Sequence, residues 1–109
     1  MKGTRGIGIT SKPYKDVSTL FKDPVGRKVR IVLKDNLGLD LDVGTASVVP
    51  REHARVCYRG GVEFRGYIKS FNPSGSNPSI KVQRAVVVGF SGGYDIYVSK
   101  DEIDHYEFL

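Results

Sequence analysis

The sequence predicts one small, mostly β domain: a barrel of about five to seven short strands, with a short N-terminal helix and a basic, flexible arm. Three observations support this prediction. Several segments alternate apolar with polar residues, which is the period of a half-buried strand. Clusters of Gly, Pro, Asn and Asp separate these segments at spacings of roughly 8 to 14 residues. The 109 residues fit one domain, and six Tyr and five Phe supply material for one modest core.

The first 13 residues, MKGTRGIGITSKP, are basic, contain three glycines and one proline, and include no acid. Such a segment cannot bury much apolar surface, so we interpret it as a flexible arm that precedes a barrel domain over residues 14–109. A basic arm of this kind is able to track a phosphate backbone and to order on contact. A frayed terminus without a partner is the alternative.

The first half of the domain predicts a helix and then strands. Residues 16–23 predict a short helix that Asp16 caps and Pro24 ends. Residues 25–35 alternate as a strand whose outward face is basic. Its inward residues are Val29, Ile31 and Leu33.

Residues 39–49 also alternate, and they predict one strand with Asp40 and Asp42 pointing outward. Residues 51–57 predict a helical turn that runs into a short strand. Residues 62–71 predict a further strand, with a bulge or a close backbone approach at Gly66.

The second half predicts a β meander with a closing strand. Its expected elements are a loop at 72–78, a strand at 79–90, a hairpin turn at 91–93, a strand at 94–98, a capped turn at 99–103 and a last strand at 105–109.

Charge is unevenly distributed along the chain. The net charge is +5 and the pI is near 9.4. Residues 1–34 carry a balance of +7 and residues 55–84 of +5, whereas residues 35–54 carry −3 and residues 85–109 carry −4. Such a chain predicts one basic and one acidic face, and a basic face suits a phosphate backbone. The alternative is a solvated surface that keeps a small protein soluble.

No set of residues predicts an enzyme, a cofactor or a metal site. Residues 89–93, GFSGG, match G-x-S-x-G, but a strand-like segment follows them, so we interpret them as a hairpin turn. The glycines at 3, 6 and 8 lack the preceding strand and following helix of a nucleotide-binding loop. Glu52, His53 and Cys57 are too few for a stable zinc site, even on one helical turn.

The sequence also bears on location. The single cysteine, Cys57, cannot form an internal disulfide, and no window approaches the roughly 18 apolar residues of a membrane span. The N-terminal segment has no apolar region of a secretory signal. We therefore expect a cytoplasmic protein, of a cell or of a virus-infected host, without a membrane partner.

Basic residues interleave with aromatic residues around the strand at 62–71. If Phe64 points inward, then Arg65, Tyr67 and Lys69 share its exposed face. A tyrosine ring there would stack on a base while the cations contact phosphates. The alternative is a surface tyrosine packed between lysine and arginine stems, which is common on sheets.

Two stretches resemble the SH3-like small barrels and, among them, the Sm-like proteins. Residues 16–36 are similar to their N-terminal helix and first strand, with the pattern G-x-x-V-x-I-x-L-x-D-[GN] beginning at Gly26. Residues 64–72, continuing to 79–82, resemble their second strand, loop and third strand, and residues 95–109 resemble the closing strand, turn and strand of SH3-like barrels. The resemblance covers about half of the chain and implies a small barrel that leans towards nucleic acid.

Together these observations predict a non-catalytic nucleic-acid-binding protein, for RNA or DNA, acting as a regulatory or viral accessory factor. The expected contact residues are Lys2, Arg5, Lys12, Lys15, Arg27, Lys28, Arg30, Arg59, Arg65, Tyr67 and Lys69. The alternative is a protein–protein interaction module that docks on a cellular or host machine through the acidic C-terminal face, residues 95–107. A homo-oligomeric structural subunit is a third interpretation.

Overall fold

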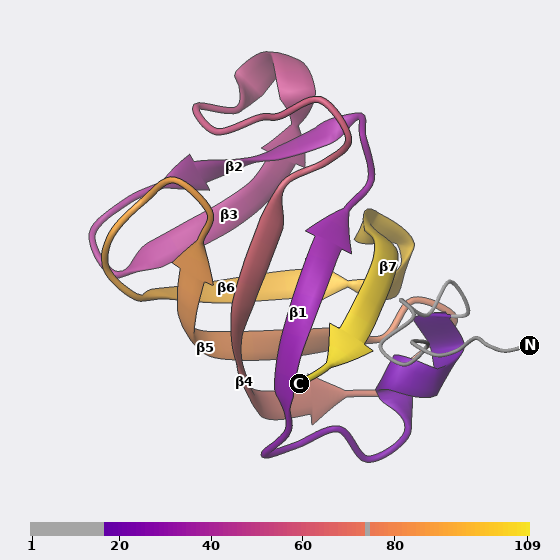
Figure 1. Cartoon of the computed structure of the whole chain (residues 1–109). Coiled ribbons are helices and arrows are strands. Elements are labelled where there is room, and N and C mark those ends of the chain that lie inside the picture. The colour runs from indigo at the N-terminus through magenta and orange to yellow at the C-terminus, as the bar shows by residue number, and fades with distance from the viewer. Residues whose placement is uncertain (1–16, 74) are drawn as a thin grey trace, which may run out of the picture.

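Seven strands form one curled sheet in the computed structural model, which describes residues 17–73 and 75–109 (Figure 1). The elements are η2 (Val17–Phe21), β1 (Lys28–Leu33), β2 (Leu37–Leu41), β3 (Thr45–Pro50), η3 (Arg51–His53), β4 (Glu63–Asn72), β5 (Ser79–Val87), β6 (Tyr94–Ser99), η4 (Lys100–Glu102) and β7 (Ile103–Phe108). The mostly β prediction is confirmed. The predicted arm, the Asp16 cap and the glycines at 3, 6 and 8 lie outside the described residues, as do Lys2, Arg5, Lys12 and Lys15.

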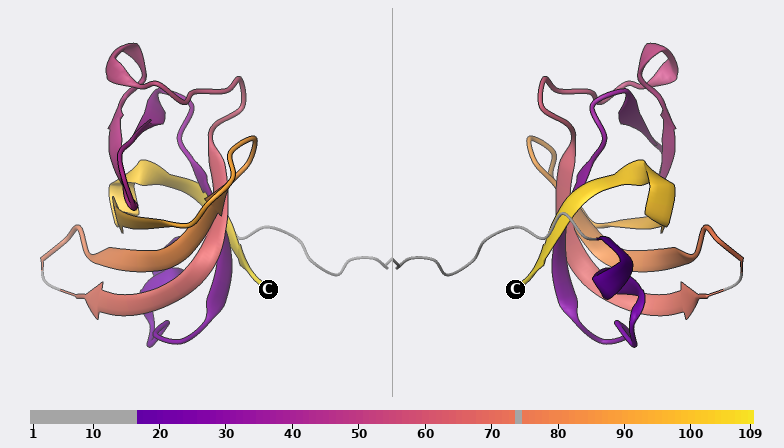
Figure 2. Two further views of the ribbon diagram at one scale, coloured as in Figure 1. Left: turned by 90° about the vertical axis from the view of Figure 1, so that its left-hand side faces the viewer. Right: turned by 90° about the vertical axis from the view of Figure 1, so that its right-hand side faces the viewer.

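The strand order is β2-β3-β6-β5-β4-β1-β7. Every neighbouring pair is antiparallel except β3 and β6, which run parallel. Strong coiling of β4 and β5 bends the sheet into a half-barrel, as the side views in Figure 2 show. The neighbouring strands β5, β4 and β1 contribute to the outer, convex face of this half-barrel.

The core lies on the inner side of this sheet. Val29, Ile31 and Leu33 are fully buried, as the alternation of β1 predicted. The predicted helix is a single 3-10 turn, η2, which ends before Pro24 and buries Leu20 completely. Burial of one leucine side chain contributes about 1.5–3 kcal/mol. The partly buried Val17 and Phe21 also pack against the core, so η2 is anchored by its apolar face.

One predicted strand is wrong: residues 39–49 form the β2–β3 hairpin. The Asp42 carboxylate accepts the Val43 backbone N–H at 2.7 Å, and Gly44 has a φ of +74°. These two features make a tight turn and leave the Val43 side chain 96% exposed at its tip. Similarly, the strand expected over 79–90 ends at Val87, because a turn follows in which Gly89 has a φ of +91°.

The segment after β3 covers the outer edge of β2. As predicted, a helical turn (η3) leads into a short extended contact, in which Leu39 and Val56 exchange backbone hydrogen bonds of 2.9 and 3.0 Å. This contact pairs polar backbone groups that an edge strand would otherwise leave open.

Gly66 marks the predicted bulge in β4. The register between β4 and β5 shifts between Arg65 and Tyr67. A Cβ atom on Gly66 would lie 2.7 Å from Val82 Cγ1 and 2.8 Å from the Gln83 carbonyl oxygen. Only glycine lets the two backbones approach this closely.

The turn between β6 and β7 is capped as predicted. The Ser99 backbone N–H donates to the Glu102 carboxylate at 2.8 Å in a capping box. Burial raises the pKa of Glu102 above its ordinary value of 4.5, the hydrogen bond from Ser99 opposes this shift, and the charge of Asp101 adds to it.

We expect Gly66→Ala to lower the free energy of unfolding by about 1–3 kcal/mol, because the added methyl group overpacks the β4–β5 contact. Urea denaturation measures this. Gly93→Ala is the matched control, since its Cβ would meet no atom closer than 3.4 Å. Equal stability of the two variants would contradict the assignment of Gly66.

We expect Glu102→Gln to stabilise the protein relative to the unaltered chain at pH 7 but not at pH 3. The folded state binds the Glu102 proton more tightly than the unfolded state. In the unaltered chain, protonated Glu102 therefore stabilises the fold at low pH, and this contribution is lost as the pH rises through the raised pKa. Glutamine stays neutral and still accepts the Ser99 N–H. Thermal unfolding at both pH values measures the difference, with the exposed Glu52→Gln as control. A difference independent of pH would contradict the expectation.

Candidate nucleic-acid interface

The fold brings together two basic segments that are distant in the sequence. β1 comes from the basic residues 1–34, and β4 and β5 come from the basic residues 55–84. These three strands are neighbours in the sheet, while the acidic segments supply β2, β3 and β6 on one side of them and β7 on the other (Figure 1). The positive charge is therefore gathered by topology.

Tyr67 lies in the middle of this outer face. Arg65, Tyr67 and Lys69 are exposed, and the residues between them, Gly66 and Ile68, are buried, as predicted. The Tyr67 side chain is 45% exposed. It is opposite Lys28 on β1, whose Nζ lies 5.8 Å from the ring centroid. The open ring of Tyr67 thus has Lys28 opposite it on β1 and Lys69 two residues further along β4.

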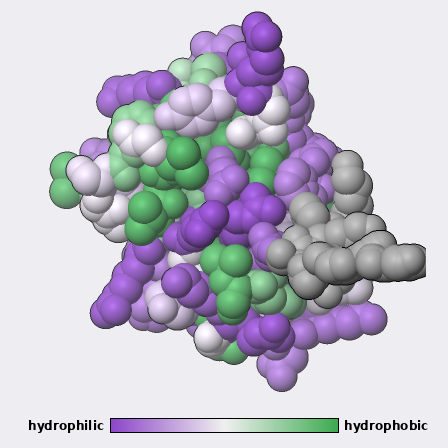
Figure 3. Space-filling model, viewed as in Figure 1, coloured by the Kyte–Doolittle hydropathy of each residue, from purple (hydrophilic) through white to green (hydrophobic). Residues whose placement is uncertain are grey.

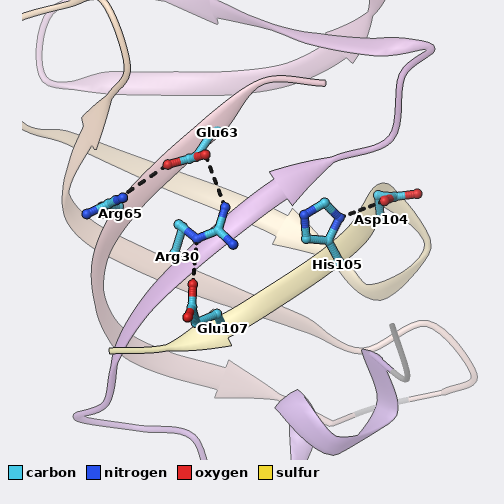
Figure 4. A network of polar contacts seen from close by, with 6 residues as sticks. All are labelled: Arg30, Glu63, Arg65, Asp104, His105 and Glu107. Atoms are coloured by element: carbon cyan, nitrogen blue, oxygen red, sulfur yellow. Dashed lines mark hydrogen bonds and ion pairs between the residues drawn. The ribbon is translucent and has the colours of Figure 1, made fainter. Parts of the chain in front are cut away.

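A balanced ion network occupies the next positions on β4 and β1 (Figure 4). Arg30 donates to Glu107 at 2.8 Å and to Glu63 at 3.1 Å, and Glu63 also pairs with Arg65 at 3.5 Å. The hydrogen bond to Glu107 is the largest of the causes that raise the pKa of Arg30. Figure 3 shows hydrophilic residues across the centre of this face. Two arginines and two glutamates leave this region neutral.

This network changes the expected picture of β1. The outward face was predicted to be basic, but the Arg30 side chain is only 16% exposed and is held by two carboxylates. Arg65 is 55% exposed and keeps open donors besides its pairing with Glu63. The unpaired charge that β1 and β4 contribute to this face is therefore centred on Lys28 and Lys69.

The remaining predicted contacts lie at different distances from Tyr67. The guanidinium of Arg27 lies 3.8 Å over the Phe108 ring, and the Arg27 carbonyl accepts the backbone N–H of Ile68, so this residue borders the face. Arg59 lies in the turn before β4, where the neighbouring Gly60 N–H donates to Asp35. The structure does not bring Arg59 to the other predicted residues.

Sequence reasoning missed a second aromatic position, Tyr97. It lies on β6 between the buried Ile96 and Val98 and is 64% exposed. Lys81 on β5 is opposite Tyr97, with its Nζ 5.5 Å from the ring centroid and 3.6 Å from an Asp95 carboxylate oxygen. Residues 94–98 alternate in the sequence, and this alternation already indicates that the Tyr97 side chain points outward.

Three of the five acids of residues 95–107 are paired with a basic side chain. Asp95 pairs with Lys81, Glu107 with Arg30, and Asp104 with His105. Asp101 and Asp104 line an open groove together with Lys34 and Lys100. A protein partner on this acidic stretch stays a prediction.

The motifs considered for chemistry take other places. Residues 89–93 lie in the connection between antiparallel β5 and β6, so GFSGG is a hairpin turn, as predicted. η3 ends at His53, so His53 and Cys57 do not share a helical turn. Within residues 17–73 and 75–109, no three His, Cys, Asp or Glu side chains are grouped to hold a metal ion. The helices of that part of the chain are all too short or too polar to cross a membrane.

Comparisons with protein-family models, with curated proteins and with solved structures find no match to this chain. The functional inference therefore rests on the geometry of this face.

We expect Glu107→Gln to lower the free energy of unfolding by about 1–2 kcal/mol, because a neutral acceptor replaces the carboxylate that pairs with Arg30, whose side chain is only 16% exposed. Denaturant unfolding measures it. Arg55→Gln is the control, since it breaks the Arg55–Asp40 pair at a side chain that is 76% exposed. Such an exposed pair contributes at most about 1 kcal/mol. A loss no larger than that of the control would contradict a structural role for the network.

Proposed function

We propose that this protein is a non-catalytic nucleic-acid-binding protein, for RNA or DNA, that holds its ligand on the outer face of β1 and β4. The observation that carries the proposal is the open ring of Tyr67, 45% exposed, between Lys28 and Lys69. It lies where the two basic segments of the chain become neighbours.

The chemistry of the three side chains is complementary. A tyrosine ring stacks on any base, and lysines neutralise the adjoining phosphates. Arg65 adds planar donors beside the ring, although Glu63 takes part of its charge. Neither kind of contact depends strongly on base identity, so the proposed binding is tolerant of sequence.

The N-terminal segment belongs to the same proposal. Residues 1–16 account for +3 of the net charge of +5. Lys2, Arg5, Lys12 and Lys15 would add phosphate contacts and would raise the salt dependence of binding.

We also propose the finer fold class, an SH3-like and weakly Sm-like barrel. The order η2–β1 at the start of the described chain and β6–η4–β7 at its end support it. A cytoplasmic, regulatory or viral accessory role is part of this proposal.

A protein-interaction module is the alternative, and one observation favours it. Tyr58, Val86, Val88 and Phe90 are each between 38 and 53% exposed, and the Tyr58 hydroxyl donates to the Val88 carbonyl. Contiguous exposed apolar side chains mark protein contacts more often than nucleic-acid contacts.

Fluorescence anisotropy with labelled single-stranded RNA, single-stranded DNA and duplex DNA over a salt series tests the proposal. We expect binding by the full chain that weakens steeply with salt. Lys28→Ala/Lys69→Ala is expected to reduce the slope of log K against log salt by about 1.4, since each phosphate contact on a single strand contributes about 0.7.

The control variant is Lys22→Ala/Lys34→Ala, which removes the same charge outside this face. Equal slopes for the two double variants would place the contacts elsewhere. Absence of binding to all three ligands at low salt would overturn the proposal and favour the protein-interaction module.

A further inference from the structure

Tyr97 is the most exposed of the large aromatic side chains in the described chain, at 64% against 45% for Tyr67. Its position follows from the pleat of β6, because both of its neighbours, Ile96 and Val98, point into the core. This much open surface leaves the Tyr97 ring accessible to a ligand.

Tyr97 and Tyr67 lie on the same face of the sheet. β5 separates them: Lys81 on β5 is opposite Tyr97, and Gln83 is opposite Tyr67. Lys81 and Gln83 are two residues apart with the fully buried Val82 between them, so both point outward. From the spacing of strands and residues, their Cα atoms are separated by roughly 12 Å measured along the sheet.

Each tyrosine has a lysine of the neighbouring strand beside its ring. The Nζ–centroid distances are 5.8 Å for Lys28 and Tyr67 and 5.5 Å for Lys81 and Tyr97. Asp95 lies 3.6 Å from Lys81 and lowers the net charge at the second ring. The arrangement of ring and cation is therefore repeated across β4, β5 and β6, with less free charge at Tyr97.

We infer that Tyr67 and Tyr97 are two base-stacking positions for one ligand and that this ligand is a single-stranded nucleic acid. The inference rests on the proposed function and names its ligand. In a duplex, each base face is covered by the next base pair, so rings on a protein surface reach only the ends. The two rings also rise from a broad sheet, whereas the major groove admits a helix or a two-stranded ribbon.

The test uses the full chain and labelled oligo-dT and oligo-U of about 15 nucleotides, which is within the span that small sheet domains bind. We expect Tyr97→Ala to weaken binding by about 5- to 150-fold, which corresponds to the stacking of one base. Tyr97→Phe keeps the stacking ring and is expected to bind as the unaltered chain does. Val43→Ala is the control, because Val43 is 96% exposed at the β2–β3 turn. Unchanged thermal unfolding of each variant shows that folding is intact.

The outcomes separate this inference from the proposed function. If Tyr67→Ala weakens binding and Tyr97→Ala does not, the second position is overturned while the proposed function stands. If a duplex of the same length binds as tightly as the single strands, the single-strand inference is overturned. If no nucleic acid binds, both fail. A loss with Tyr97→Ala that Tyr97→Phe restores, together with weaker duplex binding, supports the inference.

Discussion

The centre of the sheet depends on one carboxylate, that of Glu63. The register of β1 and β4 places Arg30 directly opposite Arg65, and two like charges at such a position destabilise a strand pair. Glu63 accepts from Arg30 and pairs with Arg65, and Glu107 on β7 completes the set. Glu63 and Glu107 compensate the positive charges of Arg30 and Arg65, so that β1 and β4 are able to pair. This pairing brings the two basic segments of the chain together on the outer face.

The same network decides which charges remain for a ligand. It neutralises the positions of β1 and β4 near Glu63 and leaves Lys28 and Lys69 beside Tyr67. On the β5 side, Val86 is opposite Arg65. Val86 is exposed, as are Val88 and Phe90 further along the chain, and these side chains form the apolar region. The outer face is thus divided into a neutral, an apolar and a basic–aromatic region. Only the basic–aromatic region is complementary to a phosphate backbone with exposed bases.

Elements with a local signal were predicted well. β1, β4 and β6 follow alternation, and the η4 turn follows its capping residues. The β2–β3 hairpin was missed because its turn, Asp42 to Gly44, does not interrupt the alternation of Leu39, Leu41 and Val43. The neutralisation of Arg30 could not be predicted, since its partners lie 33 and 77 residues away in the chain. Tyr97 was missed for a different reason. Its outward position was predictable, but Lys81, the cation beside its ring, lies 16 residues earlier in the chain.

Charge and stacking contribute separately to the proposed binding. Residues 17–109 carry a charge balance of +2, against +3 for residues 1–16, so more than half of the net charge lies in the N-terminal segment. Counterion release depends on salt, whereas stacking on a tyrosine ring depends on it weakly. The salt slope would therefore report mainly on the N-terminal segment and Lys28 and Lys69, and the affinity that persists at high salt would report on the tyrosines. In this proposal, the preference for unpaired bases comes from stacking on Tyr67 and Tyr97.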